Sequence, residues 1–400
     1  MVSGRSVEKS GENVLHHLPQ VDGVRGIAIL LVLWYHGPFL FRALPDFSPH
    51  HSPWSMLGLF GRMSLGGWIG VDLFFVVSGF LITMILLRVK EMSGSYLAFW
   101  ERRALRIFPL AIVYLVSLFI LVRLGDPLDV LASFDAWPWY AFYLGNLHIT
   151  FNGWQPLAIM ILWSLAIEEQ FYLVWPFVVR MCDSHQLLRW SIGCVVIAPL
   201  VRAITVVMAD YPATYVFTLC RLDALAAGAV VAVCYSSKTL RDLVMASCKR
   251  LAPPALAVIL LVLVVPFSPS LPQARPWFFT VFGYTGIATS LAILLMASLD
   301  ARGPIERLLT SRILTFLGRR CYGLYIWHVL AGGIAIMALH PWHVGFLAHA
   351  AVWLAILLMM ASVSWLLLEA PMLRLKRFFS YGGNPSRTGS FPILRPLKIR

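Results

Sequence analysis

Charged residues are scarce in this chain of 400 residues. They make up 13% of the sequence, whereas a soluble domain carries about 25%. Hydrophobic residues reach 59%, and the mean hydropathy is +0.77. No long polar block separates the apolar stretches, which recur from residue 19 to residue 370. This composition argues against a soluble enzyme with one anchor and predicts a single integral membrane domain.

Metal-binding spacings and the common catalytic motifs are also missing. The six cysteines lie mostly within apolar runs and show no metal-ligand spacing, so we expect buried thiols and no metal. There is no Gly-x-Ser-x-Gly elbow, no His-Glu-x-x-His pair and no glycine-rich phosphate loop. The chemistry must therefore come from other side chains.

Acidic residues are fewer than basic ones, 19 against 32, which gives a net charge of +13. The excess does not indicate nucleic-acid binding, because the basic residues cluster in short loops between apolar runs. That clustering is the positive-inside pattern of membrane proteins, and it places these loops in the cytoplasm. The basic positions are Arg5, Lys9, Arg88, Lys90, Arg102, Arg103, Arg106, Lys238, Arg241, Lys249, Arg250, Arg302, Arg307, Arg312, Arg374, Lys376 and Arg377.

Eleven apolar runs are candidates for membrane spans. Basic loops at both ends of the stretch 104–235 require an even number of crossings, yet five runs lie there. The weakest, 134–151, contains Asp135, Pro138, Asn146 and His148, so we expect an outer re-entrant or interfacial segment. The eleven runs are 19–41, 67–89, 104–123, 134–151, 160–180, 189–209, 213–235, 252–267, 277–298, 313–338 and 344–368.

The predicted fold is an all-α, polytopic integral membrane bundle of about ten transmembrane helices, plus one possible re-entrant segment. Both termini are expected in the cytoplasm. Residues 1–18 form a cytoplasmic N-terminal segment, residues 19–372 the membrane domain, and residues 373–400 a basic, disordered tail. The oligomeric state is left open, and membrane lipids are the expected surroundings.

The first span carries three ionisable groups, Asp22, Arg25 and His36. Their offsets of 3, 11 and 14 residues from one another place them within roughly 60° on one helix face. Arg25 and His36 are then about 16 Å apart along the axis. Ionisable groups at membrane depth are costly and mark functional or paired sites, so this face is predicted to line the interior.

Two further motifs carry charge into the bundle. Arg103 and Arg106 are three residues apart and share a helix face, where they either anchor the span or bind a phosphate-rich ligand such as coenzyme A. Glu168 and Glu169 begin another helix, and one of them is expected to orient an imidazole or handle a proton. Ser164 shares a face with Glu168, and Tyr172 shares another with Glu169. In this topology the arginines lie near the inner face, whereas His36 and both glutamates lie in the outer half.

Three more polar residues have two interpretations each. Asp72 either lines a substrate pocket or pairs with an intramembrane arginine such as Arg221. The neighbouring Asp223 is expected to have a structural pairing role. His328 is either a satisfied structural group or part of a cavity wall.

In this order, the segments resemble the acyltransferase-3 family of integral-membrane acyltransferases. The resemblance extends from about residue 18 to 372. It rests on the motifs Asp22-Gly23-Val24-Arg25-Gly26 with His36, Gly70-Val71-Asp72-Leu73-Phe74-Phe75 with Ser78-Gly79-Phe80, Arg103-x-x-Arg106-Ile107-x-Pro109, Trp163-Ser164-Leu165 through Tyr172, Arg221-Leu222-Asp223-Ala224 and Leu324-Tyr325-Ile326-Trp327-His328.

The resemblance implies transfer of an acyl group, often acetyl, from cytoplasmic acyl-CoA to a hydroxyl of an extracytoplasmic carbohydrate, in a bacterial inner membrane. It assigns Arg25, Arg103 and Arg106 to the acyl-CoA donor, and His36, Glu168 and Glu169 to catalysis. His36 would act as a base or as a covalent acyl carrier. Asp72, Ser164, Tyr172, Arg221 and His328 remain substrate-pocket candidates.

Other functions remain open on the sequence alone. A transporter or flippase for a lipid-linked sugar would explain the intramembrane charges but not the paired arginines, and the chain shows no internal repeat. An acyltransferase of the unrelated lipid-modifying class also uses an intramembrane histidine. A small-molecule acceptor is a further alternative to a glycan.

Overall fold

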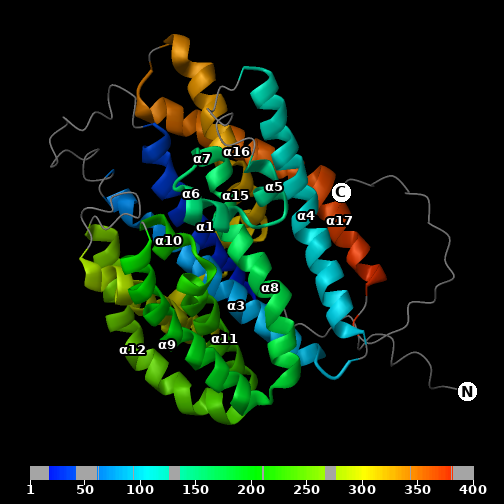
Figure 1. The fold of residues 1–400 in the computed structure, drawn as a ribbon, viewed down its shortest axis with the longest axis vertical. Coiled ribbons are helices and arrows are strands. Elements are labelled where there is room, and N and C mark those ends of the chain that lie inside the picture. The colour runs from blue at the N-terminus through cyan, green and yellow to red at the C-terminus, as the bar shows by residue number, and fades with distance from the viewer. Residues whose placement is uncertain are drawn as a thin grey trace, which may run out of the picture.

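The computed structural model describes residues 18–41, 61, 63–92, 94–125, 136–209, 211–265, 276–342, 344–379 and 381. Within these ranges the protein is helical and contains no β-strand (Figure 1). The main helices are α1 (Pro19–Leu40), α3 (Ile69–Val89), α4 (Ser95–Arg123), α8 (Leu162–Met181), α9 (Ser184–Met208), α11 (Leu222–Ser236), α12 (Lys238–Val264), α13 (Tyr284–Leu299), α15 (Arg312–Leu339) and α16 (Phe346–Ser364).

Nine helical stretches in the described ranges are long and apolar enough to cross a membrane. They correspond to every long helix named above except α1. Helix α1 has 22 residues, which gives a length of about 33 Å, enough for a hydrocarbon core of about 30 Å. With α1 the described part holds the expected ten. The predicted all-α polytopic bundle is confirmed.

The described part of the run 134–151, from residue 136 onward, does not form a spanning helix. Its described residues form α5 (Trp137–Ala141) and α6 (Gly145–Asn152), which are 5 and 8 residues long. Both are far shorter than the roughly 20 residues that a crossing needs. Gln170 anchors the segment to α8 by donating to the backbone oxygen of Tyr143 at 2.9 Å and to Asn146 Oδ1 at 2.9 Å. The described part of this run is therefore two short helices anchored to α8, with Tyr140 and Ile149 buried and Phe142 and Phe151 exposed.

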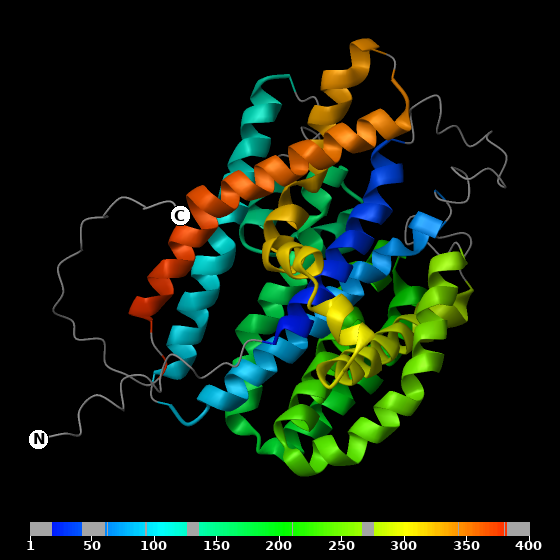
Figure 2. The same cartoon turned by 180° about the vertical axis from the view of Figure 1, so that it is seen from behind.

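Helices α1 and α3 lie at the centre of the bundle, between α15 on one side and α11 on the other (Figures 1 and 2). Glycines allow these close approaches. A Cβ atom at Gly318 of α15 would lie 1.8 Å from the backbone oxygen of Asp22, and one at Gly79 of α3 would lie 1.9 Å from that of Leu225. Small residues at helix crossings are typical of membrane bundles. The close contacts fix the relative depth of the charged residues.

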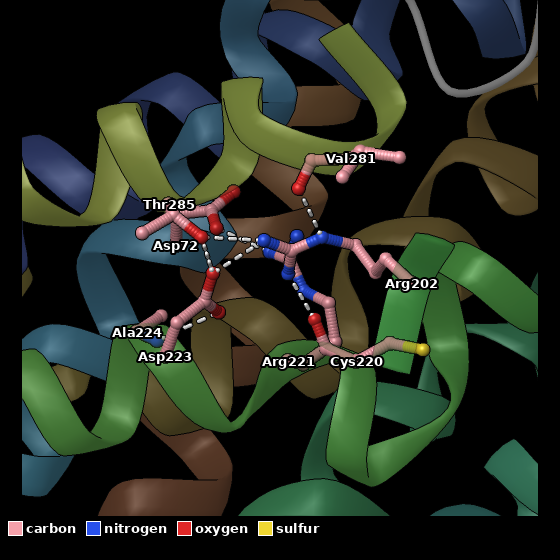
Figure 3. Close-up of polar contacts among 8 residues, drawn as sticks. All are labelled: Asp72, Arg202, Cys220, Arg221, Asp223, Ala224, Val281 and Thr285. Atoms are coloured by element: carbon pink, nitrogen blue, oxygen red, sulfur yellow. Dashed lines mark hydrogen bonds and ion pairs between the residues drawn. The ribbon is translucent and has the colours of Figure 1, made fainter. Parts of the chain in front are cut away.

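A buried cluster of four charges, shown in Figure 3, joins α3, α9 and α11. Asp72 forms an ion pair with Arg221, and Asp223 Oδ2 lies 2.9 Å from Arg202 Nη2. Thr285 Oγ1 of α13 donates to Asp223 Oδ2 at 2.7 Å. The four side chains are at most 1% exposed, and their formal charges cancel. Pairing of this kind makes charges tolerable at membrane depth.

The short elements lie at the helix ends. Helix α8 is preceded by α7 (Leu157–Met160), and the chain turns between them at Ile161, whose backbone oxygen accepts from Tyr325 Oη at 2.8 Å. The remaining elements are η2 (Leu65–Trp68), α10 (Tyr211–Val216), η4 (Thr218–Arg221), η6 (Phe279–Gly283), α14 (Pro304–Leu309), η7 (His340–Trp342), η8 (Trp365–Glu369), α17 (Ala370–Arg374) and η9 (Leu375–Phe378). Most of the predicted tails, 1–18 and 373–400, lies outside the described residues, although the helical chain continues to Phe378.

Candidate active site

A pocket with both polar and apolar lining opens between five helices. Helix α1 contributes one arginine, α4 two arginines, α3 a serine, α8 a serine, a glutamate and a tyrosine, and α15 a cysteine and two tyrosines. The lining residues are Arg25, Val71, Phe74, Phe75, Val77, Ser78, Leu81, Arg103, Arg106, Ile107, Ser164, Leu165, Glu168, Tyr172, Cys321, Tyr322 and Tyr325. Residues separated by about 300 positions in sequence thus meet at one site.

Three guanidinium groups gather at one end of this pocket. Arg25 lies 3.6 Å from Asp22 Oδ1 and donates to Cys321 Sγ at 3.1 Å. The Arg103 guanidinium lies over the ring of Tyr172, 4.9 Å from its centroid. Arg106 lines the same pocket as Arg25 and Arg103, so the three charges share one cavity. The expectation that Arg25 adds a third cation to the Arg103–Arg106 pair agrees with this geometry.

Glu168 is fixed opposite these cations. Ser78 Oγ donates to its Oε1 at 3.0 Å, and Tyr172 Oη donates to its Oε2 at 2.6 Å. The predicted division into two layers is wrong here, because Glu168 lines the same pocket as Arg103 and Arg106. The reason is that α8 begins at Leu162, before the two glutamates and not at them. Glu168 therefore lies about 9 Å along the helix axis from the first residue of α8, deeper in the bundle than a helix start would be.

Glu169 faces a different space. It lines a second, largely apolar groove with Trp100, Phe108 and Phe142, and its Oε1 is buried without a hydrogen-bond partner among the described residues. Arg103 and Tyr172 line both spaces and form the wall between them. The expectation that Glu169 and Tyr172 share a helix face agrees with the groove that both line, although the Tyr172 hydroxyl donates to Glu168.

A chain of polar groups continues from the pocket to two histidines. Ser164 Oγ and Tyr325 Oη are 2.7 Å apart at the pocket wall. One helical turn beyond Tyr325, the ring of His328 lies 4.6 Å from that of His36, centroid to centroid. His328 is fully buried and His36 is 8% exposed. The pocket therefore leads from the arginines toward a pair of imidazoles, although neither imidazole lines it.

The backbone sets the tautomer of His36. Its Nδ1 lies 3.0 Å from the backbone oxygen of Val32. Because a carbonyl oxygen can only accept, Nδ1 carries the proton and Nε2 keeps its lone pair. No carboxylate within the described residues bonds to this ring, so the expected role of Glu168 or Glu169 in orienting it is not borne out by the geometry. The carbonyl of Val32 orients the ring instead, leaving Nε2 free to act as a base.

Asp72 and Arg221 are not among the residues that line the pocket. They pair with each other in the charge cluster of Figure 3, which agrees with the structural interpretation of Asp72 and with the pairing role expected for Asp223. Arg221 is also enclosed by aromatic rings, with its guanidinium carbon 4.7 Å from the centroid of Tyr284 and 5.1 Å from that of Tyr215. Cation–π contacts stabilise such a buried guanidinium.

Sequence reasoning gave no role to four residues of this region: Ser78, Arg202, Cys321 and Tyr325. A sequence signal was available for three of them. Ser78 and Tyr325 lie within the motifs that carry the family resemblance, and Arg202 is the arginine in the interior of the apolar run 189–209, which also begins with Arg189. Cys321 offered no signal, because a cysteine in an apolar run is ordinarily a small buried hydrophobe.

Comparison with known proteins identifies the relatives of this chain. The Bacillus subtilis (strain 168) protein YrhL, whose name assigns it to peptidoglycan O-acetylation, is 32% identical over 339 residues, which cover 78% of this chain and 48% of that protein. The peptidoglycan O-acetyltransferase OatA of Listeria monocytogenes serovar 1/2a is 29% identical over 331 residues, covering 78% of this chain and 49% of OatA. The chain thus spans about half the length of these curated relatives. No solved structure matches it.

The model of a known family covers most of the chain. Residues 18–369 match the Acyl_transf_3 model, described as an acyltransferase domain. This range contains all eleven residues that the sequence nominated for the site and every helix that lines the pocket. The resemblance expected from the motifs is thereby confirmed: the chain belongs to the acyltransferase-3 family of membrane acyltransferases.

Proposed function

We propose that this protein transfers an acyl group, acetyl in the simplest case, from acyl-CoA to a hydroxyl of a cell-wall glycan such as peptidoglycan. One observation carries the proposal: a single pocket has three arginines at one end and leads toward the His36–His328 pair at the other. The names of the relatives, which refer to peptidoglycan O-acetylation, support the acceptor class.

The donor would enter from the arginine end. Arg103 and Arg106 match phosphate oxygens with their planar guanidinium groups, and Arg25 adds a third positive charge. The pantetheine arm would then extend along the pocket past Glu168, placing the thioester near the Ser164–Tyr325 pair. Holding the reacting carbonyl in one place converts the reaction into an effectively unimolecular step.

His36 would take the proton from the acceptor. As its Nε2 removes the hydroxyl proton, the acceptor oxygen attacks the thioester carbonyl carbon and forms the new ester bond. The carbon–sulfur bond breaks, and the CoA sulfur leaves with the electron pair and receives a proton. In the alternative route, Nε2 attacks the thioester itself and carries the acyl group to the acceptor. Both routes need the bare Nε2 that the Val32 contact leaves available.

Arginine substitutions test the donor site. We expect Arg103→Ala and Arg106→Ala each to raise the apparent KM for acyl-CoA about tenfold or more, because each removes charge-assisted hydrogen bonds to phosphate. Lysine at either position should rescue only partly, since a point charge cannot form a bidentate fork. The measurement is transfer of labelled acetyl to glycan fragments by purified protein, as a function of acetyl-CoA concentration.

Arg123→Ala is the matched control, because Arg123 is exposed at the opposite end of the same helix α4. Its KM for acetyl-CoA should equal that of the wild type. An unchanged KM in both the Arg103 and Arg106 variants would refute the donor site. A wild-type protein that moves a lipid-linked sugar but no labelled acetyl would instead identify a transporter.

The proposal also places the donor end in the cytoplasm of an inner membrane, with both termini inside. Contacts between loops support this arrangement. Lys90, between α3 and α4, donates to the backbone oxygen of Cys182, between α8 and α9. Arg102 donates to backbone oxygens of the C-terminal segment. These contacts bring three segments together at one end of the bundle: the α3–α4 connection with the start of α4, the α8–α9 connection and the C-terminal segment. Their charge, or their place in the order of crossings, assigns all three to the cytoplasm.

Single cysteines test this topology. Glu91→Cys and Ser237→Cys, introduced into a cysteine-free background, should stay unlabelled by an impermeant thiol reagent on intact cells, whereas Tyr211→Cys should react. All three should react after the membrane is permeabilised, which controls for accessibility. Labelling at position 237 but not at 211 on intact cells would show that the number of crossings between residues 104 and 235 is odd.

A further inference from the structure

The C-terminal segment after α16 returns to the start of α4. Arg102 Nη1 donates to the backbone oxygens of Lys376 and Phe379, each at 3.1 Å. The guanidinium carbon of Arg102 also lies 4.9 Å from the ring centroid of Tyr381. In both overall views, α17 lies beside α4 (Figures 1 and 2). Arg102 thus holds η9 against the helix that carries Arg103 and Arg106, although η9 lies beyond the residues that match the family.

This docking places a lysine beside the arginines of α4. Lys376 is half-buried in η9, and its backbone oxygen accepts from Arg102, the neighbour of Arg103 in the chain. Burial and the charges of the α4 arginines lower the pKa of Lys376 to about 6, whereas a bound phosphate would favour its protonated form. Within the described ranges, no ion pair is formed by Lys376, Arg103 or Arg106. Like charges that approach one another away from bulk water repel strongly. The cluster therefore favours an anion with several negative charges.

Two buried carboxylates of this region are bonded elsewhere. Glu168 accepts from Ser78 and Tyr172 inside the pocket. Glu369 accepts from Ser364 Oγ at 3.2 Å. Within the described residues neither forms an ion pair with Lys376, so this lysine has no carboxylate partner there.

We propose that Lys376, positioned by Arg102, binds a phosphate at the nucleotide end of the acyl-CoA donor. The inference rests on the proposed function and extends the donor site beyond the pocket. Lys376 does not line the pocket, so the phosphate that it binds lies outside, while the pantetheine arm passes Arg103 and Arg106 to the thioester. An ammonium group is a suitable partner for phosphate as a point charge.

The test uses full-length protein in nanodiscs of phosphatidylcholine, a lipid without net charge. The Kd is measured for CoA and for adenosine 3′,5′-diphosphate, a fragment that carries phosphates but no pantetheine. Lys376→Ala should raise both Kd values about tenfold, and Lys376→Arg should restore most of the affinity. Because Lys376 does not line the pocket, the loss should appear in the binding of both probes, including the one without a pantetheine arm.

Arg377→Ala is the matched control. Arg377 is the next residue in the chain, and it is exposed with its guanidinium over the ring of Phe378. Its variant should bind both probes as the wild type does. The thermal melting temperature of each variant in nanodiscs shows that the fold is kept.

Three results would overturn the inference. In the first, the Kd values are unchanged in Lys376→Ala while CoA binding is still weakened in Arg106→Ala. This result would restrict the donor site to the arginines and leave the proposed function intact. In the second, Lys376→Ala keeps the wild-type Kd values but changes activity only in nanodiscs that contain phosphatidylglycerol. This result would assign Lys376 to a lipid headgroup. A wild-type protein that binds neither probe would overturn the proposed function as well.

Discussion

His36→Ala is expected to lower acyl transfer by a factor of about 10² to 10⁴, the usual contribution of a positioned general acid–base group. The contact between Nδ1 and the Val32 carbonyl leaves Nε2 with its lone pair at the end of the path that begins at the arginines. The decrease should appear in kcat, with little change in the Kd for acyl-CoA, because His36 does not line the donor pocket. Labelled acetyl transfer and CoA binding, measured on the same preparation, give both quantities.

The matched control is His185→Ala, because His185 is exposed at the start of α9 and has no role in the site. Its activity should equal that of the wild type. Transfer at near-wild-type rate by a folded His36→Ala variant would contradict the role of this histidine in either route.

A second measurement distinguishes the two routes. Labelled acetyl-CoA is incubated with the protein in the absence of acceptor, and the protein is isolated and digested. Acetyl on the peptide that contains His36 would show a covalent carrier, whereas an unmodified peptide and a requirement for acceptor would show a general base. The neighbouring Nε2 of His328, which is buried without a partner among the described residues, provides a second position to inspect.

Residue spacing within one helix predicted much of this architecture. Asp22, Arg25 and His36 share a face of α1, and Arg103 and Arg106 share a face of α4, because helical periodicity alone decides which side chains point together. The number of spans followed from hydropathy and loop charge, which reflect the cost of placing polar groups in hydrocarbon. These are local properties, so a single sequence was sufficient for them.

Relations between helices could not be predicted in the same way. Glu168 and Glu169 are neighbours in sequence, yet they face different spaces, because successive residues are rotated by about 100° around a helix axis. Which of them faces the arginines depends on the rotation and start of α8, and these are set by packing around the break at Ile161. The contact of Lys376 with Arg102 depends likewise on two segments more than 250 positions apart.

Asp72→Ala is expected to destabilise the protein by about 3 to 5 kcal/mol, because it leaves the Arg221 guanidinium buried without its carboxylate. Unfolding of purified protein by sodium dodecyl sulfate in mixed micelles measures this loss. The matched control is Asp300→Ala, which breaks the exposed ion pair with Lys249. That change should alter the free energy of unfolding by only about 0 to 1 kcal/mol.

The double variant Asp72→Leu with Arg221→Met separates pairing from catalysis. It removes one positive and one negative charge together, so the Arg202–Asp223 pair remains and the cluster stays neutral. Replacing a whole buried ion pair by apolar residues of similar volume is often neutral or stabilising. We therefore expect the double variant to regain most of the stability lost in Asp72→Ala. It should also transfer acetyl at close to the wild-type rate, because neither residue lines the pocket. A stable double variant without activity would show that Asp72 or Arg221 acts on substrate, and the pocket would then have to extend from α8 across α3 to the charge cluster.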